Sequence, residues 1–162
     1  VVKVLGGLLQ AQFLKIITSQ NFSIDGNLIE GKRVVTKTGD YTYSVVLTGG
    51  KITFTDGTTY THEFNRIRTW ADGYDTPLNI WDDVYTIEGI ATGINRKGNA
   101  YTNTITNALV IKNDCRWIVE GTLEMVSNGK TAVLDYGKGE CDNIATITAN
   151  GKTTEIKLKN KR

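Results

Sequence analysis

The chain has 162 residues, enough for one domain that buries a core without metals or several disulfides. Its net charge of +2, with both signs mixed, is too small to indicate a nucleic-acid partner, and no apolar run approaches the roughly 18 residues of a transmembrane helix. Glycine is abundant, at 17 residues. Together with threonine, valine, isoleucine and tyrosine, it gives the composition of antiparallel sheets joined by tight turns.

The N-terminal segment from Val1 to Ile17 is the most apolar part of the chain. Val1 to Leu5 predicts a strand. Leu8 to Ile17 allows a strand or a helix, and we favour a strand because the following residues have β character. A docking segment is a further alternative for this region. No signal-peptide cleavage site or initiator methionine is present, so we expect the chain to lack a leader or anchor segment.

Strand and turn signals then alternate. Tight turns are predicted at Asp25-Gly26-Asn27, Gly39-Asp40, Gly49-Gly50 and Asp56-Gly57. Thr58 to Trp70 is predicted to be one long strand, whose even-numbered face carries Tyr60, His62, Phe64, Arg66, Arg68 and Trp70. Neither face of this strand is cleanly apolar. We therefore expect it to lie at a sheet edge or to line a polar groove.

The segment from Ala71 to Asp83 is predicted to be the longest loop, and it contains Pro77, the only proline. Further strands are predicted at residues 83–93, 101–111, 117–125, 132–136, 144–149 and 153–158, with a turn at Asn150-Gly151-Lys152. No alternation of strands and helices is present. We predict a single all-β domain over residues 1–162, an antiparallel meander of about ten strands that forms a β-sandwich or a partly open up-and-down barrel.

Cys115 and Cys141 are the only two cysteines. Each precedes a predicted strand, which would place both at one end of the sheet and within the Cα spacing of a disulfide. A catalytic or metal-binding pair would need a nearby histidine, and the single one, His62, is distant in the sequence. A structural disulfide worth about 3 kcal/mol is therefore favoured, although a reduced cytosolic pair would give the same pattern.

Four carboxylates crowd the long loop: Asp72, Asp75, Asp82 and Asp83. Carboxylate oxygens are calcium ligands, so these residues form a weak calcium candidate. Their spacing fits no EF-hand, and capping of turns is the favoured role. The glycine-rich segment from Asp135 to Asp142 looks like a phosphate loop, but it lies between strands and lacks the Gly-Lys-Ser/Thr ending, so we interpret it as a structural turn.

Three aromatic residues, Trp70, Tyr74 and Trp81, surround the long loop, and Arg66 and Arg68 are near them in the sequence. Exposed rings among polar residues could stack on sugars or anchor a protein partner. The favoured alternative is that the rings cover one end of the core. These five residues are nevertheless the best candidate for a ligand or partner site. No nucleophile or carboxylate pair accompanies His62, so we expect no catalytic residues, no cofactor and no enzymatic activity.

A set of short motifs occurs in a fixed order: Arg68-Thr69-Trp70, Thr76-Pro77, Asp82-Asp83-Val84-Tyr85, Cys115, Trp117-Ile118-Val119, Leu134-Asp135-Tyr136-Gly137, Gly139, Cys141-Asp142 and Asn150-Gly151. From about Phe22 onward, the chain resembles uncharacterised β-rich surface lipoproteins of Bacteroidota. The resemblance implies export to the outer membrane or cell surface and a lipid anchor on a cysteine outside this chain. Such a location also favours the disulfide.

The expected function is a non-enzymatic surface module with a structural or partner-docking role, such as an accessory subunit of an outer-membrane complex. An exposed apolar edge or patch would support this expectation. The alternative is a glycan-binding module, which requires Trp70, Tyr74 and Trp81 to be exposed and roughly coplanar. A third possibility is a barrel around a lipid-like ligand, recognisable by an apolar cavity with an open mouth.

Overall fold

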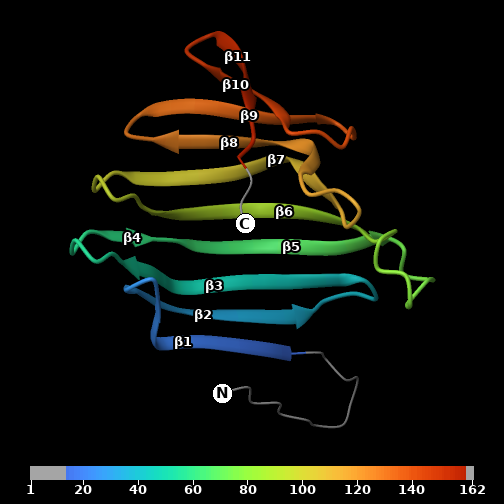
Figure 1. Ribbon diagram of the computed structural model, residues 1–162, viewed down its shortest axis with the longest axis horizontal. Coiled ribbons are helices and arrows are strands. Elements are labelled where there is room, and N and C mark those ends of the chain that lie inside the picture. The colour runs from blue at the N-terminus through green and yellow to red at the C-terminus, as the bar shows by residue number, and fades with distance from the viewer. Residues whose placement is uncertain (1–13, 160–162) are drawn as a thin grey trace.

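The computed structural model describes residues 14–159, which form eleven antiparallel strands. The strands are β1 (Leu14–Ile24), β2 (Asn27–Lys37), β3 (Thr42–Thr53), β4 (Thr59–Thr61), β5 (Glu63–Asp72), β6 (Val84–Ile94), β7 (Ala100–Lys112), β8 (Ile118–Ser127), β9 (Lys130–Lys138), β10 (Ile144–Ala149) and β11 (Lys152–Lys157). They lie side by side in chain order, except that the short β4 pairs with β3 outside this series (Figure 1). The prediction of an all-β antiparallel meander is confirmed.

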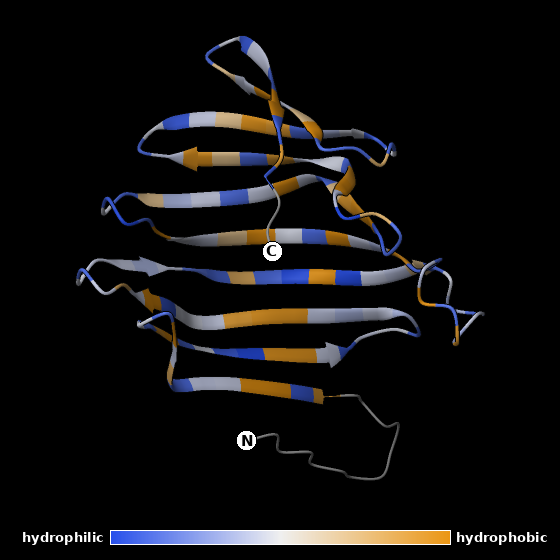
Figure 2. Cartoon of the chain, in the orientation of Figure 1, coloured by the Kyte–Doolittle hydropathy of each residue, from blue (hydrophilic) through white to orange (hydrophobic). Residues whose placement is uncertain are grey.

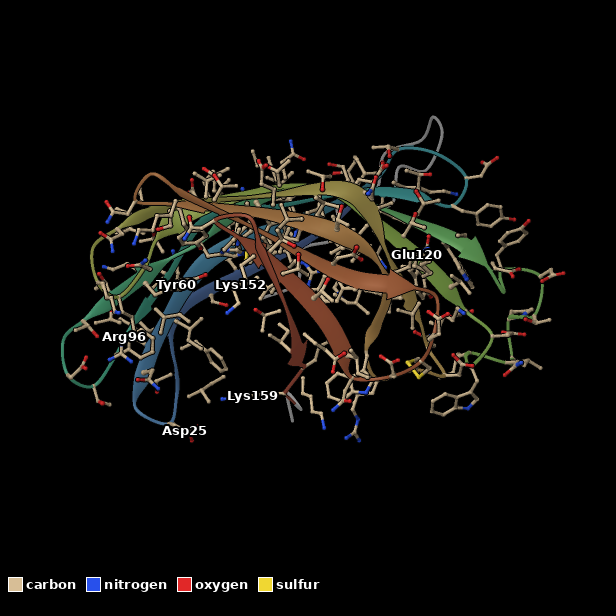
Figure 3. The ribbon with its side chains drawn as sticks, turned by 90° about the horizontal axis from the view of Figure 1, so that it is seen from above. Asp25, Tyr60, Arg96, Glu120, Lys152 and Lys159 are labelled. Carbon is tan, nitrogen blue, oxygen red and sulfur yellow. A yellow bond between two sulfur atoms is a disulfide. The ribbon has the colours of Figure 1, made fainter. Side chains whose placement is uncertain are left out.

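All the strands belong to one open sheet. Within residues 14–159, β1 pairs only with β2 and β11 pairs only with β10, so the sheet does not close into a barrel. Figure 3 shows that the sheet is strongly arched. The described part of the chain has no second sheet packed face to face on the first, so the architecture is the open form of the predicted meander and not a sandwich.

Three tight turns fix hairpin registers. Asp25-Gly26, Asn128-Gly129 and Asn150-Gly151 each have both residues at positive φ, the type I′ geometry that suits the twist of the flanking strands. The first and third of these turns join β1 to β2 and β10 to β11 where the sequence predicts hairpins. Glycine, asparagine or aspartate at each position keeps the left-handed backbone inexpensive.

The predicted turn at Gly49-Gly50 is wrong, because β3 continues through both glycines to Thr53. The register of β2 against β3 shifts opposite this point, and Gly49 has a φ of 60°. A Cβ on Gly50 would collide with the carbonyl oxygen of His62. The glycines therefore form a bulge that bends the strand and lets a neighbouring backbone approach closely.

The predicted long strand over residues 58–70 divides at His62 into β4 and β5. The edge position expected for it is wrong, because β5 lies inside the sheet between β3 and β6. At the N-terminal end, Leu14 to Ile17 are strand and not helix, while the rest of the predicted N-terminal segment lies outside the described residues. No helix in residues 14–159 is long and apolar enough to cross a membrane.

The core is thin. Within residues 14–159, the buried apolar residues are Val45, Ala91, Leu109, Cys115, Val119 and Ala145. Hydrophobic and hydrophilic residues are mixed along the strands (Figure 2). Since a sheet normally buries one face against a second layer, a single open sheet leaves many apolar side chains only half-buried.

Candidate functional site

One face of the sheet holds two adjoining hollows, and we call it the hollow face. The first hollow has a volume of about 380 Å³ and is lined by Lys15, Ile17, Arg33, Val35, Tyr43, Val45, Arg68, Trp70 and Tyr85. The second has a volume of about 350 Å³ and shares Ile17 and Arg33 with the first. It continues along the strands to Ile29, Leu47, Ile52, Tyr60 and His62. The hollow face therefore carries a continuous groove across β1 to β6.

Three arginines lie on or beside this groove: Arg33, Arg66 and Arg68. Neither of the two ion pairs within residues 14–159 involves them. The Arg68 guanidinium lies 3.8 Å from the centre of the Tyr85 ring, and that of Arg66 lies 4.6 Å from the centre of the Phe64 ring. Burial, followed by the charge of Arg33, lowers the pKa of Arg66. Arg66 and Arg68 thus contact aromatic rings, and none of the three arginines forms an ion pair with a carboxylate of the described residues.

The five predicted binding residues are not gathered in one place. Arg68 and Trp70 line the first hollow, and Arg66 lies beside Arg68 on the same face of β5, whereas Tyr74 and Trp81 lie in the loop after β5. Trp70 is half-buried, with its ring centroid 5.9 Å from that of Tyr85. Its Nε1 is buried without a hydrogen-bond partner among the described residues. The exposed platform of three rings that glycan binding requires is not formed.

The loop between β5 and β6 presents apolar side chains to solvent. Leu78 is 100% exposed, Trp81 65% and Ile80 57%. Tyr74 is 44% exposed and stacks on Tyr41, with ring centroids 4.3 Å apart. Figure 2 shows this loop with hydrophobic segments at one end of the sheet. The sequence pattern identified Trp81, but it missed Leu78 and Ile80, whose exposure depends on how the loop folds.

Hydrogen bonds within the loop hold its backbone. The Asp82 carboxylate accepts hydrogen bonds of 2.8 Å from Thr76 Oγ1 and from Asn79 Nδ2. Asn113 Nδ2 donates to the Ile80 carbonyl oxygen at 2.8 Å, which ties the loop to the segment after β7. The loop is therefore fixed by its polar residues while its apolar residues point outward.

Three of the four aspartates of the calcium candidate, Asp72, Asp82 and Asp83, make separate local contacts. Asp72 accepts from the Gly73 backbone N–H, and Asp82 accepts from the loop side chains. Asp83 is buried and accepts from the Tyr85 hydroxyl at 2.9 Å and from Asn113 Nδ2 at 3.2 Å. No group of three or more His, Cys, Asp or Glu in residues 14–159 could hold a metal ion. Of these contacts, that of Asp72 is with a backbone N–H group, as turn capping predicts, whereas Asp82 and Asp83 accept from side chains.

A cluster that the sequence did not indicate surrounds His62. Its Nδ1 lies 2.6 Å from the Tyr101 hydroxyl oxygen and 3.3 Å from that of Tyr60. Burial raises the pKa of Tyr101, and the hydrogen bond with Tyr60 raises it further. Burial, followed by the charge of Arg66, lowers the pKa of His62. The histidine is separated from Tyr101 by 39 positions, so only the strand register reveals this contact.

The predicted disulfide is present. Cys115 and Cys141 are bonded, with their Cα atoms 5.7 Å apart, and join the segment before β8 to the segment after β9. The glycine-rich segment beside Cys141 belongs to β9 as far as Lys138 and then bends toward β10. The Asp135 and Asp142 carboxylates accept from the backbone N–H groups of Gly137 and Ile144, respectively, two residues further along. Its side chains are therefore used in capping their own backbone.

The sequence matches no known family, no curated protein and no solved structure. The candidate sites are therefore interpreted from their geometry and chemistry alone.

Proposed function

We propose that this chain is a non-enzymatic surface module that docks to a protein partner through the loop between β5 and β6. The observation that carries the proposal is the exposure of Leu78, Ile80 and Trp81 on a loop whose backbone is held by hydrogen bonds. Large exposed apolar residues that gather at one site are typical of interaction surfaces. Tryptophan is also among the residues most enriched at energetic hot spots.

The internal bonding of the loop supports docking because it lowers the cost of association. A mobile loop loses conformational entropy when it binds, whereas a preorganised loop has lost most of it already. Asp82 and Asn113 fix the loop through side chains that lie behind the apolar tip. The tip can therefore enter a pocket on a partner without rearrangement.

The geometry favours protein docking over glycan binding. Sugar recognition by stacking needs free ring faces, and Trp70 packs against Tyr85 while Tyr74 packs against Tyr41. Trp81 remains as the exposed tryptophan of the predicted three-ring set. A single ring beside Leu78 and Ile80 resembles an apolar anchor more than a sugar platform.

We also propose a location at the outer membrane or cell surface, with attachment through a lipid anchor outside this chain. The resemblance to surface lipoproteins supports this location. The disulfide is consistent with it, because disulfides persist in exported proteins and are rare in the cytosol of most organisms. A partner in an outer-membrane assembly would then meet the apolar loop outside the cytoplasm.

The test is whether the chain migrates together with a larger membrane complex. Source membranes carrying the tagged chain would be extracted in mild detergent and separated by size, and the chain would be followed by mass spectrometry. We expect the unaltered chain to migrate with a larger complex. We expect Trp81→Ala combined with Leu78→Ser to release it, because loss of a hot-spot residue costs about 2 kcal/mol or more, roughly a 30-fold weakening.

The matched control is Ile144→Ser on β10, which removes an apolar side chain of similar type that is 39% exposed, from a strand that pairs with neither β5 nor β6. This variant should stay in the complex. Migration of the unaltered chain as a free monomer would refute the proposal, and so would a complex that survives the loop substitutions. Unchanged urea midpoints for the loop variants would show that their effect is not a loss of folding.

A further inference from the structure

We propose that the groove of the hollow face binds an anionic amphiphile, a molecule with one acidic head group and a linear alkyl chain. This site is distinct from the docking loop and uses different residues. The head group would lie at the first hollow, near Arg33 and Arg68. The alkyl chain would extend through the second hollow.

The head-group end is defined by unneutralised positive charge. Lys15, Arg33 and Arg68 line the first hollow, and Arg66 lies beside it. The two ion pairs in the described part of the chain, Lys51 with Glu30 and Arg96 with Asp56, leave all four cations unpaired. Like charges gathered on one surface repel one another, and a bound anion removes that repulsion. An arginine fork also matches the two oxygens of a carboxylate.

The acidic groups nearest to the groove do not supply this anion. Asp83 is buried and occupied by hydrogen bonds from Tyr85 and Asn113. Glu30 is next to Lys51, at 3.8 Å, at the far end of the second hollow. Neither forms an ion pair with the arginines. The charge of the first hollow is therefore open to a ligand.

The tail end is defined by aliphatic walls. The second hollow is lined by Ile17, Ile29, Leu47 and Ile52, which offer methyl and methylene surfaces. Tyr60, His62 and the Glu30–Lys51 ion pair also line it. Along β2, the groove runs from Val35 in the first hollow to Ile29 in the second. Six residue steps along a strand span about 20 Å. A groove of this length with apolar walls fits an extended alkyl chain better than a short acid.

An acidic glycan is the main competitor for the same cations. Glycans need many hydrogen-bonding partners and free aromatic faces, whereas Trp70 packs on Tyr85, and Tyr60 is bonded to His62 and Tyr101. The aliphatic walls of the second hollow also have no role in glycan binding. The structure therefore favours an alkyl anion, and an acidic glycan is included in the test as the competing ligand.

The test compares dodecanoate, dodecyltrimethylammonium and a sulfated disaccharide, each below any micelle-forming concentration, by titration calorimetry and tryptophan fluorescence. Trp70 lines the first hollow and serves as a reporter. We expect dodecanoate to bind at least about tenfold more tightly than the cation with the same tail, because charge-assisted hydrogen bonds form only with the anion.

Arg33→Gln and Arg68→Gln should each weaken dodecanoate binding about tenfold. Arg116→Gln is the matched control, because this arginine is exposed and lies outside both hollows; its affinity should remain unchanged. Circular dichroism would confirm that each variant is folded. Equal binding of both dodecyl probes, binding of the disaccharide alone, or no binding at all would overturn the proposal.

Discussion

His62 is a titratable side chain whose hydrogen bonds join separate strands of the sheet. It bonds through Nδ1 to the Tyr101 hydroxyl, which also lies 2.7 Å from the Tyr60 hydroxyl and 3.0 Å from the Thr61 carbonyl oxygen. These contacts link β4 to the start of β7 across β6. A neutral imidazole can accept a hydrogen bond at Nδ1, but an imidazolium cannot. The Tyr101 hydroxyl can also accept a hydrogen bond, so its contact with Nδ1 survives protonation; burial and the nearby charge of Arg66 are what disfavour the imidazolium.

The surroundings of His62 predict that the stability of the fold depends on pH. Burial lowers the pKa of His62 in the folded state below its ordinary value of 6.5, so the unfolded chain binds the proton more readily. Stability should be fully present above pH 6.5 and should decrease as the pH falls through 6.5 toward the folded-state pKa. The measurement is the urea midpoint at pH 7.5, 6.5 and 5.5, values chosen on the general scale of histidine titration.

His62 is the only histidine in the chain, so a substitution can isolate its contribution. His62→Gln keeps a hydrogen-bonding group at this position but removes the titration, and it should flatten the decrease in the urea midpoint between neutral and mildly acidic pH. Aspartate and glutamate titrate mainly at lower pH and contribute little to this window. Equal slopes for the variant and the unaltered chain would show that His62 is not the source.

At the scale of elements, the disulfide clamps the ends of one pair of strands. Cys115 precedes β8 and Cys141 follows β9, with a sequence separation of 26. Closing a loop of this length should stabilise the fold by about 3 kcal/mol through the entropy of the unfolded chain. The variant with both Cys115→Ser and Cys141→Ser should therefore lose about this much free energy of unfolding in urea titrations.

Chemical reduction provides the control for the disulfide prediction. The reduced, unaltered chain and the double serine variant should unfold at similar urea concentrations, because both lack the same constraint. A loss well below about 1 kcal/mol in both cases would contradict a structural role for the bond. A loss in the serine variant alone would point instead to the burial of the Cys115 side chain, which is 8% exposed.

The sequence predicted the elements well where local rules decide them. Alternation of apolar residues located most strands, and Asp25-Gly26 and Asn150-Gly151 marked hairpins because few residues accept positive φ. The same rule failed at Gly49-Gly50, since a bulge and a turn need the same glycines. The sequence pattern also could not predict whether the sheet closes. Alternation with a period of two residues shows which side chains share a face of the sheet, but it does not show what covers that face.

The candidate site was predicted only in part for a similar reason. Arg66, Arg68 and Trp70 alternate along one strand, and the structure places them on one face as that spacing requires. Their neighbours Arg33 and Tyr85 come from other strands, and only the register brings them together. The exposure of Leu78 depends on the hydrogen bonds of the loop, which its sequence does not reveal.

At the scale of the whole molecule, the meander makes the stability of each strand depend almost entirely on its neighbours in the sheet. Strands pack mainly on their immediate neighbours in the sheet, and no second layer in the described residues ties distant strands together. Each strand is therefore held by one or two interfaces, as in repeat proteins, except β3, which pairs with β2, β4 and β5. The two edges also differ: β11 has six residues with three charges, whereas β1 has eleven with Lys15 as its single charge and with Leu14, Phe22 and Ile24 exposed.

This arrangement predicts local unfolding from the edges. Hydrogen exchange should be slowest in β6 to β8, inside the sheet, and fastest in β1 and β11, because strands with one interface open most easily. Reduction of the Cys115–Cys141 bond should then speed exchange in β8 and β9, next to the clamp, and leave β2 and β3 nearly unchanged. Uniform acceleration in every strand would mean instead that the sheet unfolds as one cooperative unit. In that case its single layer would transmit stability over its full width, despite the lack of contacts between distant strands.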